Sequence, residues 1–251
     1  MRMATLKSQQ NNPWFKFGIV SKHIKKTKKL FYGKYLFQVS LKIPGIYLYR
    51  EVKNYGSRKS FVEYVDNKKQ YVSQNNYWTL RHLKDADPKQ IFATWQKLKD
   101  FEDRIKVRVE ASKISICADS EETLREVLTS LKSIKAETVS LFLPANEEEA
   151  EKMKDGILFV SDPKLKFRAM IRSRRYDETV RTQIHNYVEN YEGTILMSPN
   201  LKYKLTNSGN SNDYISGYFY VDNMECLMFL QLICPTFVGK IFPLESHTIN
   251  N

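Results

Sequence analysis

Stretches rich in aromatic and β-branched residues dominate the first fifty positions. They run from Trp14 to Val20, from Tyr32 to Ile43 and from Ile46 to Val52. This composition is typical of β-strands. Pro44-Gly45 separates the last two stretches and favours a turn. The pattern therefore predicts a β-rich start with a hairpin between residues 32 and 52.

Between Arg58 and Phe101 the apolar residues change to helical spacing. Asp87, Pro88 and Gln90 have the order of a helix start: an N-cap, a proline at the first helical position and a glutamine three residues after the cap. The apolar residues that follow predict one buried stripe. They are Ile91, Phe92, Trp95 and Leu98.

After Arg104 the segments are shorter and easier to assign. Alternation predicts paired strands over 104–110 and 113–118, and a later strand over 138–143. Asp119 and Glu122 have the spacing of a capping box. The helix that they open has an apolar stripe formed by Leu124, Val127, Leu128 and Leu131. A short acidic helix over 147–154 and a strand over 156–160 complete this segment.

The last ninety residues predict two strand–helix–strand units in succession. The expected strands are 165–171, 194–197, 214–221 and 236–242. One helix has Val180, Ile184 and Val188 on one face and ends near Gly193. The other spans 223–233, with a capping box of Asp222 and Glu225 before it and Pro235 after it. This order predicts the split βαβ, or ferredoxin-like, arrangement.

The predicted fold class is therefore α+β. A basic, β-rich N-terminal region with helices precedes a ferredoxin-like C-terminal half, and the two form tandem α+β domains. The expected divisions are a basic region over 1–101, an α+β segment over 102–162 and a ferredoxin-like domain over 163–251. Many unrelated functions share this architecture, so function has to be argued from particular residues.

Composition excludes several classes of protein. Aromatic residues make up 13% of the 251 residues, which excludes wholesale disorder. No apolar run approaches the roughly 20 residues that a membrane helix needs. Polar residues over 7–12 leave no apolar core for a signal peptide. The three cysteines are odd in number and lie among apolar residues. We therefore expect a soluble cytoplasmic protein with reduced cysteines and no membrane partner.

The net charge of +12 is concentrated in one third of the chain. Residues 1–80 contain 16 lysines and arginines against 3 acidic residues, whereas the remaining 171 residues contain 24 against 25. Such asymmetry favours a polyanionic partner, because neutralising phosphates releases counterions. A solubilising basic surface is the alternative.

Motifs for metal, cofactor or nucleophile chemistry are missing. The four histidines lack metal-ligand spacing; they are His23, His82, His185 and His247. The glycines form neither phosphate-binding loop, and no nucleophile elbow occurs. The paired carboxylates have the positions of helix caps. We therefore expect no metal site, no cofactor and no catalytic residue, with metal-free RNA cleavage through His23 as the enzymatic alternative.

The strongest functional signal is a run of lysines beside aromatic residues. Six lysines occur between Lys22 and Lys34. Lysines can follow phosphates while exposed rings stack on bases, which is what single-stranded nucleic acid requires. The candidate binding residues of this region are Lys22, His23, Lys25, Lys26, Lys28, Lys29, Tyr32, Lys34, Tyr35, Tyr47, Tyr49, Arg50, Lys53, Arg58 and Lys59. Core packing of the tyrosines is the competing interpretation.

A second basic patch follows residue 163. Lys166, Arg168 and Arg172 share one parity, so we expect them on one strand face, while Phe167, Ala169 and Ile171 occupy the other. Arg174 and Arg175 extend this patch. It suits a phosphate backbone or an acidic protein, and a solvated outer face is the alternative.

The sequence therefore predicts a non-catalytic nucleic-acid-binding protein with low sequence specificity. The low specificity is expected because lysine-rich, arginine-poor surfaces contact backbones rather than read guanines. Single-stranded RNA is favoured over DNA as the ligand. Two other hypotheses stay open: a metal-free endoribonuclease, and an assembly subunit of a virus or phage that contacts nucleic acid or a neighbouring chain. A homo-oligomer is also compatible with the sequence.

Overall fold

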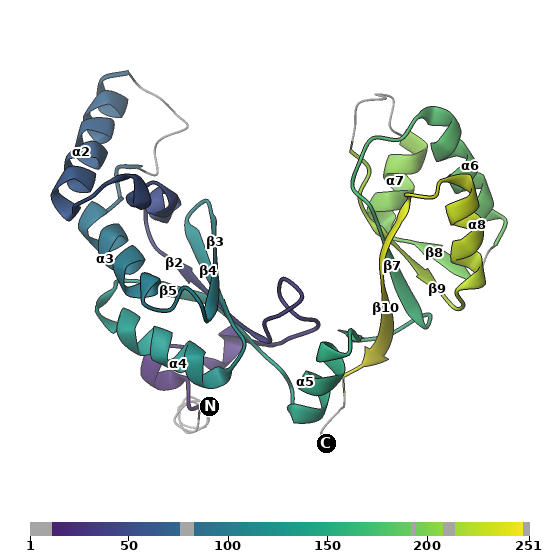
Figure 1. Ribbon diagram of the computed structural model, residues 1–251, viewed down its shortest axis with the longest axis horizontal. Coiled ribbons are helices and arrows are strands. Elements are labelled where there is room, and N and C mark those ends of the chain that lie inside the picture. Colours follow the sequence, from purple (N-terminus) through teal and green to yellow (C-terminus); the bar gives the residue numbers. More distant parts are fainter. Residues whose placement is uncertain (1–11, 76–82, 192–193, 208–213, 248–251) are drawn as a thin grey trace, which may run out of the picture. The chain divides into compact units, whose positions relative to one another are not determined.

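Two structural units divide the chain, residues 1–146 and residues 147–251. The computed structural model describes residues 12–75, 83–191, 194–207 and 214–247. Each unit has a mixed five-stranded sheet and its own apolar core. Figure 1 shows the helices and strands of the two units. The predicted α+β class is therefore confirmed. The divisions expected at residues 101 and 162 both fall inside these units, because strands on either side of each position share a sheet.

The N-terminal unit has its strands in the order β1-β5-β2-β4-β3. They are β1 (Ile24–Lys26), β2 (Phe37–Lys42), β3 (Ile105–Glu110), β4 (Lys113–Ala118) and β5 (Glu137–Leu143). β1 runs parallel to β5, and the other neighbouring pairs are antiparallel. The α-helices described in this unit are α2 (Arg58–Asn75), α3 (Pro88–Lys99) and α4 (Glu121–Ser130).

The C-terminal unit has its strands in the order β6-β10-β7-β9-β8. They are β6 (Leu158–Val160), β7 (Phe167–Ile171), β8 (Ile195–Met197), β9 (Tyr218–Val221) and β10 (Val238–Ser246). β6 runs parallel to β10, and the other pairs are antiparallel. The described α-helices are α5 (Glu147–Lys154), α6 (Glu178–Glu189), α7 (Pro199–Asn207) and α8 (Glu225–Ile233).

Both units share one topology. In the C-terminal unit the strands β7 to β10, taken in chain order, lie as 4-1-3-2, which is the predicted ferredoxin-like arrangement. In the N-terminal unit β2 to β5 lie in the same order. In each unit a short strand precedes these four strands and pairs in parallel with the fourth of them. The N-terminal copy was not predicted, because residues 43–104 separate its first two strands.

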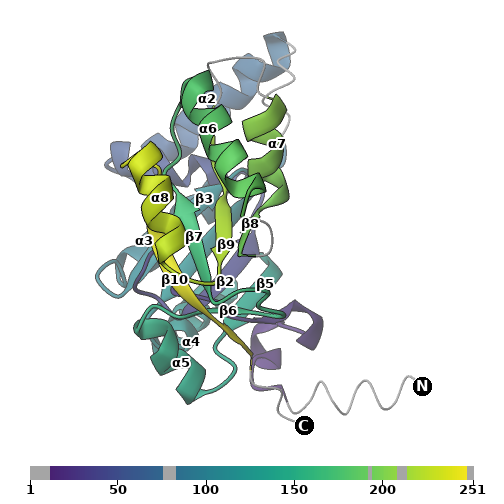
Figure 2. The same cartoon turned by 90° about the vertical axis from the view of Figure 1, so that its right-hand side faces the viewer.

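Helices pack against one face of each sheet. In the N-terminal unit the core lies between β2, β3, β4 and β5 and residues of α2, α3 and α4. In the C-terminal unit, Figures 1 and 2 show α6 and α8 on the same face of the sheet, and their apolar residues join the core of that unit. We call the sheet face turned away from these helices the open face of each unit.

Local rules located several helix starts correctly. The Asp87 carboxylate accepts hydrogen bonds from the backbone amides of Lys89 and Gln90, and Pro88 is the first residue of α3. Two other predicted caps are wrong, because the N-cap of α4 is Ser120 and that of α8 is Met224, which has no capping side chain. Ser120, not Asp119, accepts the amide hydrogen of Thr123 at α4, and Asn223 instead of Asp222 accepts that of Cys226 at α8. Gly193 lies outside the described residues.

Two predicted strands are wrong. Residues Phe15–Phe17 form a 3₁₀ helix (η1), and Ile46–Arg50 and Val52–Asn54 form two more (η3 and η4). Pro44-Gly45 is therefore not a hairpin turn. Gly45 has a φ of +75° and begins η3, which buries Ile46 and Leu48 in the core. α7 was not predicted either.

Among the described residues, no helix combines the length and apolarity needed to cross a membrane. The three cysteines, Cys117, Cys226 and Cys234, are free and buried, as the sequence predicted. Within the described ranges no cluster of three metal-ligating side chains occurs.

Candidate functional site

The lysine-rich segment begins on the edge of the N-terminal sheet. Ile24 of β1 lies opposite Leu141, whose side chain is fully buried in the core, so the next residue of each strand projects from the open face. Those residues are Lys25 and Phe142, which also lie opposite each other. The Lys25 ammonium is 5.8 Å from the centre of the Phe142 ring. One of the predicted lysines therefore lies on the open face beside an aromatic ring.

A tight turn after β1 extends over the same face. Tyr32 and Gly33 have φ values of +55° and +71°, and the amide of Lys34 donates to the carbonyl of Phe31. Phe31 contacts Phe142 on β5, with ring centres 5.7 Å apart. Tyr32 accepts a hydrogen bond from Arg108 on β3, and this bond together with the charge of Glu110 raises the pKa of Arg108. The turn thus contacts both β5 and β3.

Three further cations lie on the open side of the N-terminal sheet. Lys106 and Arg108 alternate with buried residues along β3, and Lys113 begins β4. Arg108 forms an ion pair with Glu110, whereas Lys106 and Lys113 pair with no described carboxylate. The sequence predicts strands here, but none of these three residues is among the predicted binding residues. Their alternation with Ile105, Val107 and Val109 was the available signal.

The predicted residues of the segment differ in exposure. Tyr32 is 50% exposed, whereas Tyr35 is only 8% exposed and packs into the protein. His23, in the 3₁₀ helix Ser21–His23, is half-buried, and its buried Nδ1 has no described hydrogen-bond partner. The exposed lysines are Lys22, Lys25, Lys26, Lys28, Lys29 and Lys34.

The other N-terminal candidates lie among the helices instead. Tyr47 and Tyr49 belong to η3 and pack half-buried against the core, and burial raises the pKa of each to about 12. They do not lie on a strand, so the predicted hairpin does not present them to bases. The remaining members of this group are exposed and lie in or beside η3, η4 and α2; they are Arg50, Lys53, Arg58 and Lys59.

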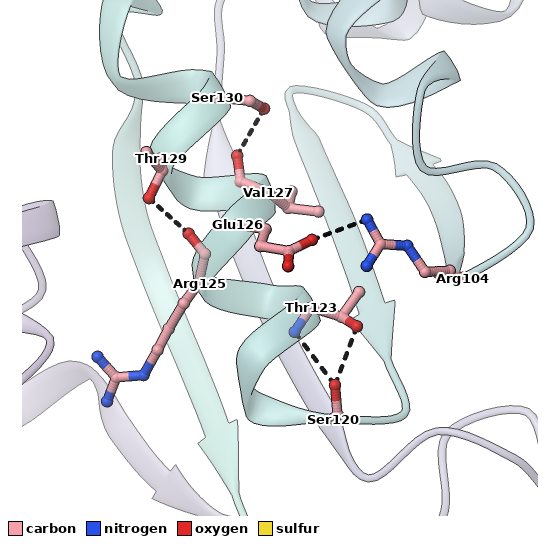
Figure 3. A network of polar contacts seen from close by, with 8 residues as sticks. All are labelled: Arg104, Ser120, Thr123, Arg125, Glu126, Val127, Thr129 and Ser130. Atoms are coloured by element: carbon pink, nitrogen blue, oxygen red, sulfur yellow. Dashed lines mark hydrogen bonds and ion pairs between the residues drawn. The ribbon is translucent and has the colours of Figure 1, made fainter.

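The cavity beside α4 is not a site for a polyanion. It encloses about 690 Å³ and is lined by residues of η1, α4 and the segment after α3. Arg104 forms an ion pair with Glu126 at 2.7 Å (Figure 3), and Arg125 pairs with Glu121. Arg125 also lies 4.3 Å from the centre of the Trp14 ring. Carboxylates therefore already neutralise both of its arginines.

The C-terminal sheet has an open face of different character. The predicted alternation along β7 is confirmed, because Ala169 and Ile171 are buried in the core while Lys166 and Arg172 are exposed. Register places one row of side chains across four strands: Phe242, Arg168, Tyr220 and Leu196. Met170 and Tyr218 form the next row. The sequence analysis found the cations of this face but not its aromatic residues.

Arg168 connects the two tyrosines of β9. Its guanidinium carbon lies 4.4 Å from the centre of the Tyr218 ring and 4.9 Å from that of Tyr220. Its Nη2 donates to the Tyr220 hydroxyl at 2.6 Å. Burial raises the pKa of Tyr218 above its ordinary value.

The two arginines after β7, Arg174 and Arg175, each lie beside a tyrosine ring. Arg174 contacts the Tyr176 ring at 4.8 Å and donates to the Cys234 sulfur at 3.4 Å. Arg175 lies 5.4 Å from the centre of the Tyr214 ring. Both side chains remain exposed.

No protein-family model matches this sequence, and a comparison with curated proteins finds no relative.

Proposed function

We propose that this protein binds single-stranded nucleic acid, RNA in preference to DNA, with low sequence specificity and without cleaving it. The observation that carries the proposal is the exposed lysine segment between Lys22 and Lys34 on the N-terminal unit. The first fifty residues contain no aspartate or glutamate. Lys22, Lys25, Lys28 and Lys34 form no ion pair with a described carboxylate. Unpaired, solvated lysines of this kind bind phosphates and release counterions.

Aromatic residues beside these lysines favour a single strand over a duplex. Tyr32 is exposed at the tip of the turn, between Phe31 and Lys34. A duplex needs cations but offers no exposed base faces, whereas unpaired bases stack on rings. Modules that present rings on an open sheet face commonly hold RNA in this way. The segment 22–34 contains no arginine, so it has no side chain for bidentate guanine recognition.

Binding without cleavage is proposed because His23 lacks the partners of a catalytic base. Metal-free RNA cleavage needs a general base and a general acid within reach of one phosphate. Among the described residues no hydrogen bond orients the His23 ring. Incubation of labelled RNA with the protein, with and without divalent metal, should therefore leave the RNA intact.

The salt dependence of binding tests the proposal. In the first variant, Lys22, Lys25, Lys28 and Lys34 are replaced by Gln. In the control variant, four exposed lysines outside the segment are replaced by Gln: Lys84, Lys99, Lys132 and Lys135. Each variant lowers the net charge from +12 to +8, so only the position of the lost charge differs. The affinity for an oligouridylate is then measured by fluorescence anisotropy at several salt concentrations.

We expect the slope of log K against log salt to become shallower by about 0.7 for each lost phosphate contact in the first variant only. The matched oligodeoxyuridylate, which differs only in the 2′-hydroxyl, should bind more weakly. If the two variants had equal salt slopes, the segment between Lys22 and Lys34 would not be part of the binding surface. Failure of the parent protein to bind any single strand would refute the proposed function itself.

A further inference from the structure

Two tyrosine rings project from the centre of the C-terminal sheet. Tyr218 and Tyr220 are separated along β9 by Phe219, which is fully buried in the core, so both lie on the open face. Their ring centres are 5.2 Å apart and the planes meet at 77°. β9 lies between β7 and β8, and β7 separates it from β10. The rings are therefore held by a paired strand inside the sheet, not by a loop.

Arg168 fixes the positions of these rings. It contacts both ring faces and donates a hydrogen bond to the Tyr220 hydroxyl. A ring that is already held in place loses little conformational freedom when a base stacks on it. The guanidinium also places a positive charge beside both rings, which favours a ligand that carries phosphates next to flat apolar groups.

Further cations surround the rings. The Lys240 ammonium on β10 lies 4.9 Å from the centre of the Phe242 ring. Phe242 itself lies opposite Arg168 in the row described above. Lys166 and Arg172 are exposed at the two ends of β7. Asp222 is the carboxylate closest in sequence to the rings, and it lies 3.3 Å from the Lys166 ammonium. The face therefore combines rings with positive charge, which is complementary to a single strand.

The N-terminal sheet lacks this feature at the matching positions. Its two central strands, β2 and β4, pair Gln38 with Cys117 and Ser40 with Ser115. In the C-terminal unit the corresponding pairs are Arg168 with Tyr220 and Met170 with Tyr218. At these matching positions the N-terminal sheet carries glutamine, cysteine and serine, whereas the C-terminal sheet carries two tyrosine rings beside an arginine. This difference suggests separate roles for the two faces.

We propose that the open face of the C-terminal sheet is a base-stacking site of its own. Two bases of a single strand stack on Tyr218 and Tyr220, while Arg172 and Lys240 contact the flanking phosphates. This inference rests on the proposed function and deepens it. The lysine segment supplies attraction to phosphates and the ring of Tyr32, and the C-terminal face supplies contact with two further bases.

Comparison of a base-bearing strand with an abasic one tests the inference. The full-length protein is titrated with an oligouridylate of about ten nucleotides and with an abasic strand of the same length and charge. The test variant combines Tyr218→Leu and Tyr220→Leu. The control combines Tyr191→Leu and Tyr203→Leu, which replaces two tyrosines that are 40% and 65% exposed in or beside the helices α6 and α7. A rescue variant combines Tyr218→Phe and Tyr220→Phe.

We expect the parent, the control and the rescue variant to prefer the uridylate by roughly 5-fold or more, since one stacked base contributes about 5- to 150-fold in affinity. The Leu variant should show a smaller preference, because only the ring of Tyr32 is left to stack, while its salt slope stays unchanged. Far-UV circular dichroism confirms that each variant is folded, and the Phe variant separates loss of the rings from loss of structure.

Two results would overturn the inference. One is a folded Leu variant that keeps the parent's full preference for the uridylate. The other is a parent protein that binds both strands equally with a steep salt slope, which would leave the proposed function standing without base stacking. A parent that binds neither strand would instead refute the proposed function, and the inference with it.

Discussion

Replacement of Gly45 by alanine tests the junction between η3 and the start of α3. Gly45 has a φ of +75°, in the left-handed region that L side chains rarely adopt. A Cβ atom added there would lie 2.2 Å from the Ala86 Cβ and 2.9 Å from its Cα. Ala86 is buried and directly precedes Asp87, the N-cap of α3. Both the positive φ and the close approach of Ala86 therefore require glycine at position 45.

Gly18 separates these two effects. Its φ is +74°, and no atom lies within 4 Å of an added Cβ. Gly18→Ala therefore carries only the backbone cost, about 1–2 kcal/mol. Gly45→Ala carries the same cost plus overpacking against Ala86, which adds about 1–3 kcal/mol. We expect a loss of about 2–5 kcal/mol at Gly45, and the difference between the variants measures the contact.

Urea unfolding followed by tryptophan fluorescence provides the assay. All three tryptophans lie between residues 1 and 146, so the signal reports on the N-terminal unit. At equal slopes, the Gly45 variant should unfold at about 1 M lower urea than the Gly18 variant. If the two variants differed by less than about 0.5 kcal/mol, Gly45 would lie in an open turn, as the hairpin prediction requires, and the packing argument would be refuted.

Two further predictions concern the stability of the N-terminal unit. Ala111 has a φ of +48° in the turn between β3 and β4, so Ala111→Gly should raise the free energy of unfolding by about 0.5–1 kcal/mol, as measured by the urea midpoint. Burial raises the pKa of Tyr47 and Tyr49 to about 12 from the ordinary 10.0, so the folded state keeps protons that the unfolded chain releases. Their contribution to stability is complete below pH 10 and is lost as the pH rises through about 12. The urea midpoint of the parent should therefore fall between pH 10 and about pH 12. In the double variant Tyr47→Phe with Tyr49→Phe the midpoint should fall less steeply. An equal fall in the parent and in the double variant would contradict the role given to these two tyrosines.

Local patterns in the sequence determined much of the secondary structure. The cap at Asp87 and the proline after it located α3, and strict alternation located β3 and β4. In the C-terminal half, strands and helices alternate at short intervals, so the order of elements was enough to predict the ferredoxin-like arrangement. The parity of Lys166, Arg168 and Arg172 was also correct. These features depend on residues that lie within a few positions of each other.

Contacts between distant residues decided the rest. Residues 46–50 have the composition of a strand, but burial of Ile46 and Leu48 and the approach of Gly45 to Ala86 make them a 3₁₀ helix. The N-terminal ferredoxin order depends on the pairing of β2 with β4 and β5, which lie many residues later in the chain.

The composition of the open faces also required the tertiary structure. Sequence placed the lysines near aromatic residues, but only the fold brings Phe31 to Phe142 and Tyr32 to Arg108. In the C-terminal unit, strand register places Arg168 opposite Tyr220, fifty-two residues away. Composition and alternation therefore determined which residues are charged, aromatic or buried. Strand pairing decided which of them meet, because register joins positions that no local pattern connects.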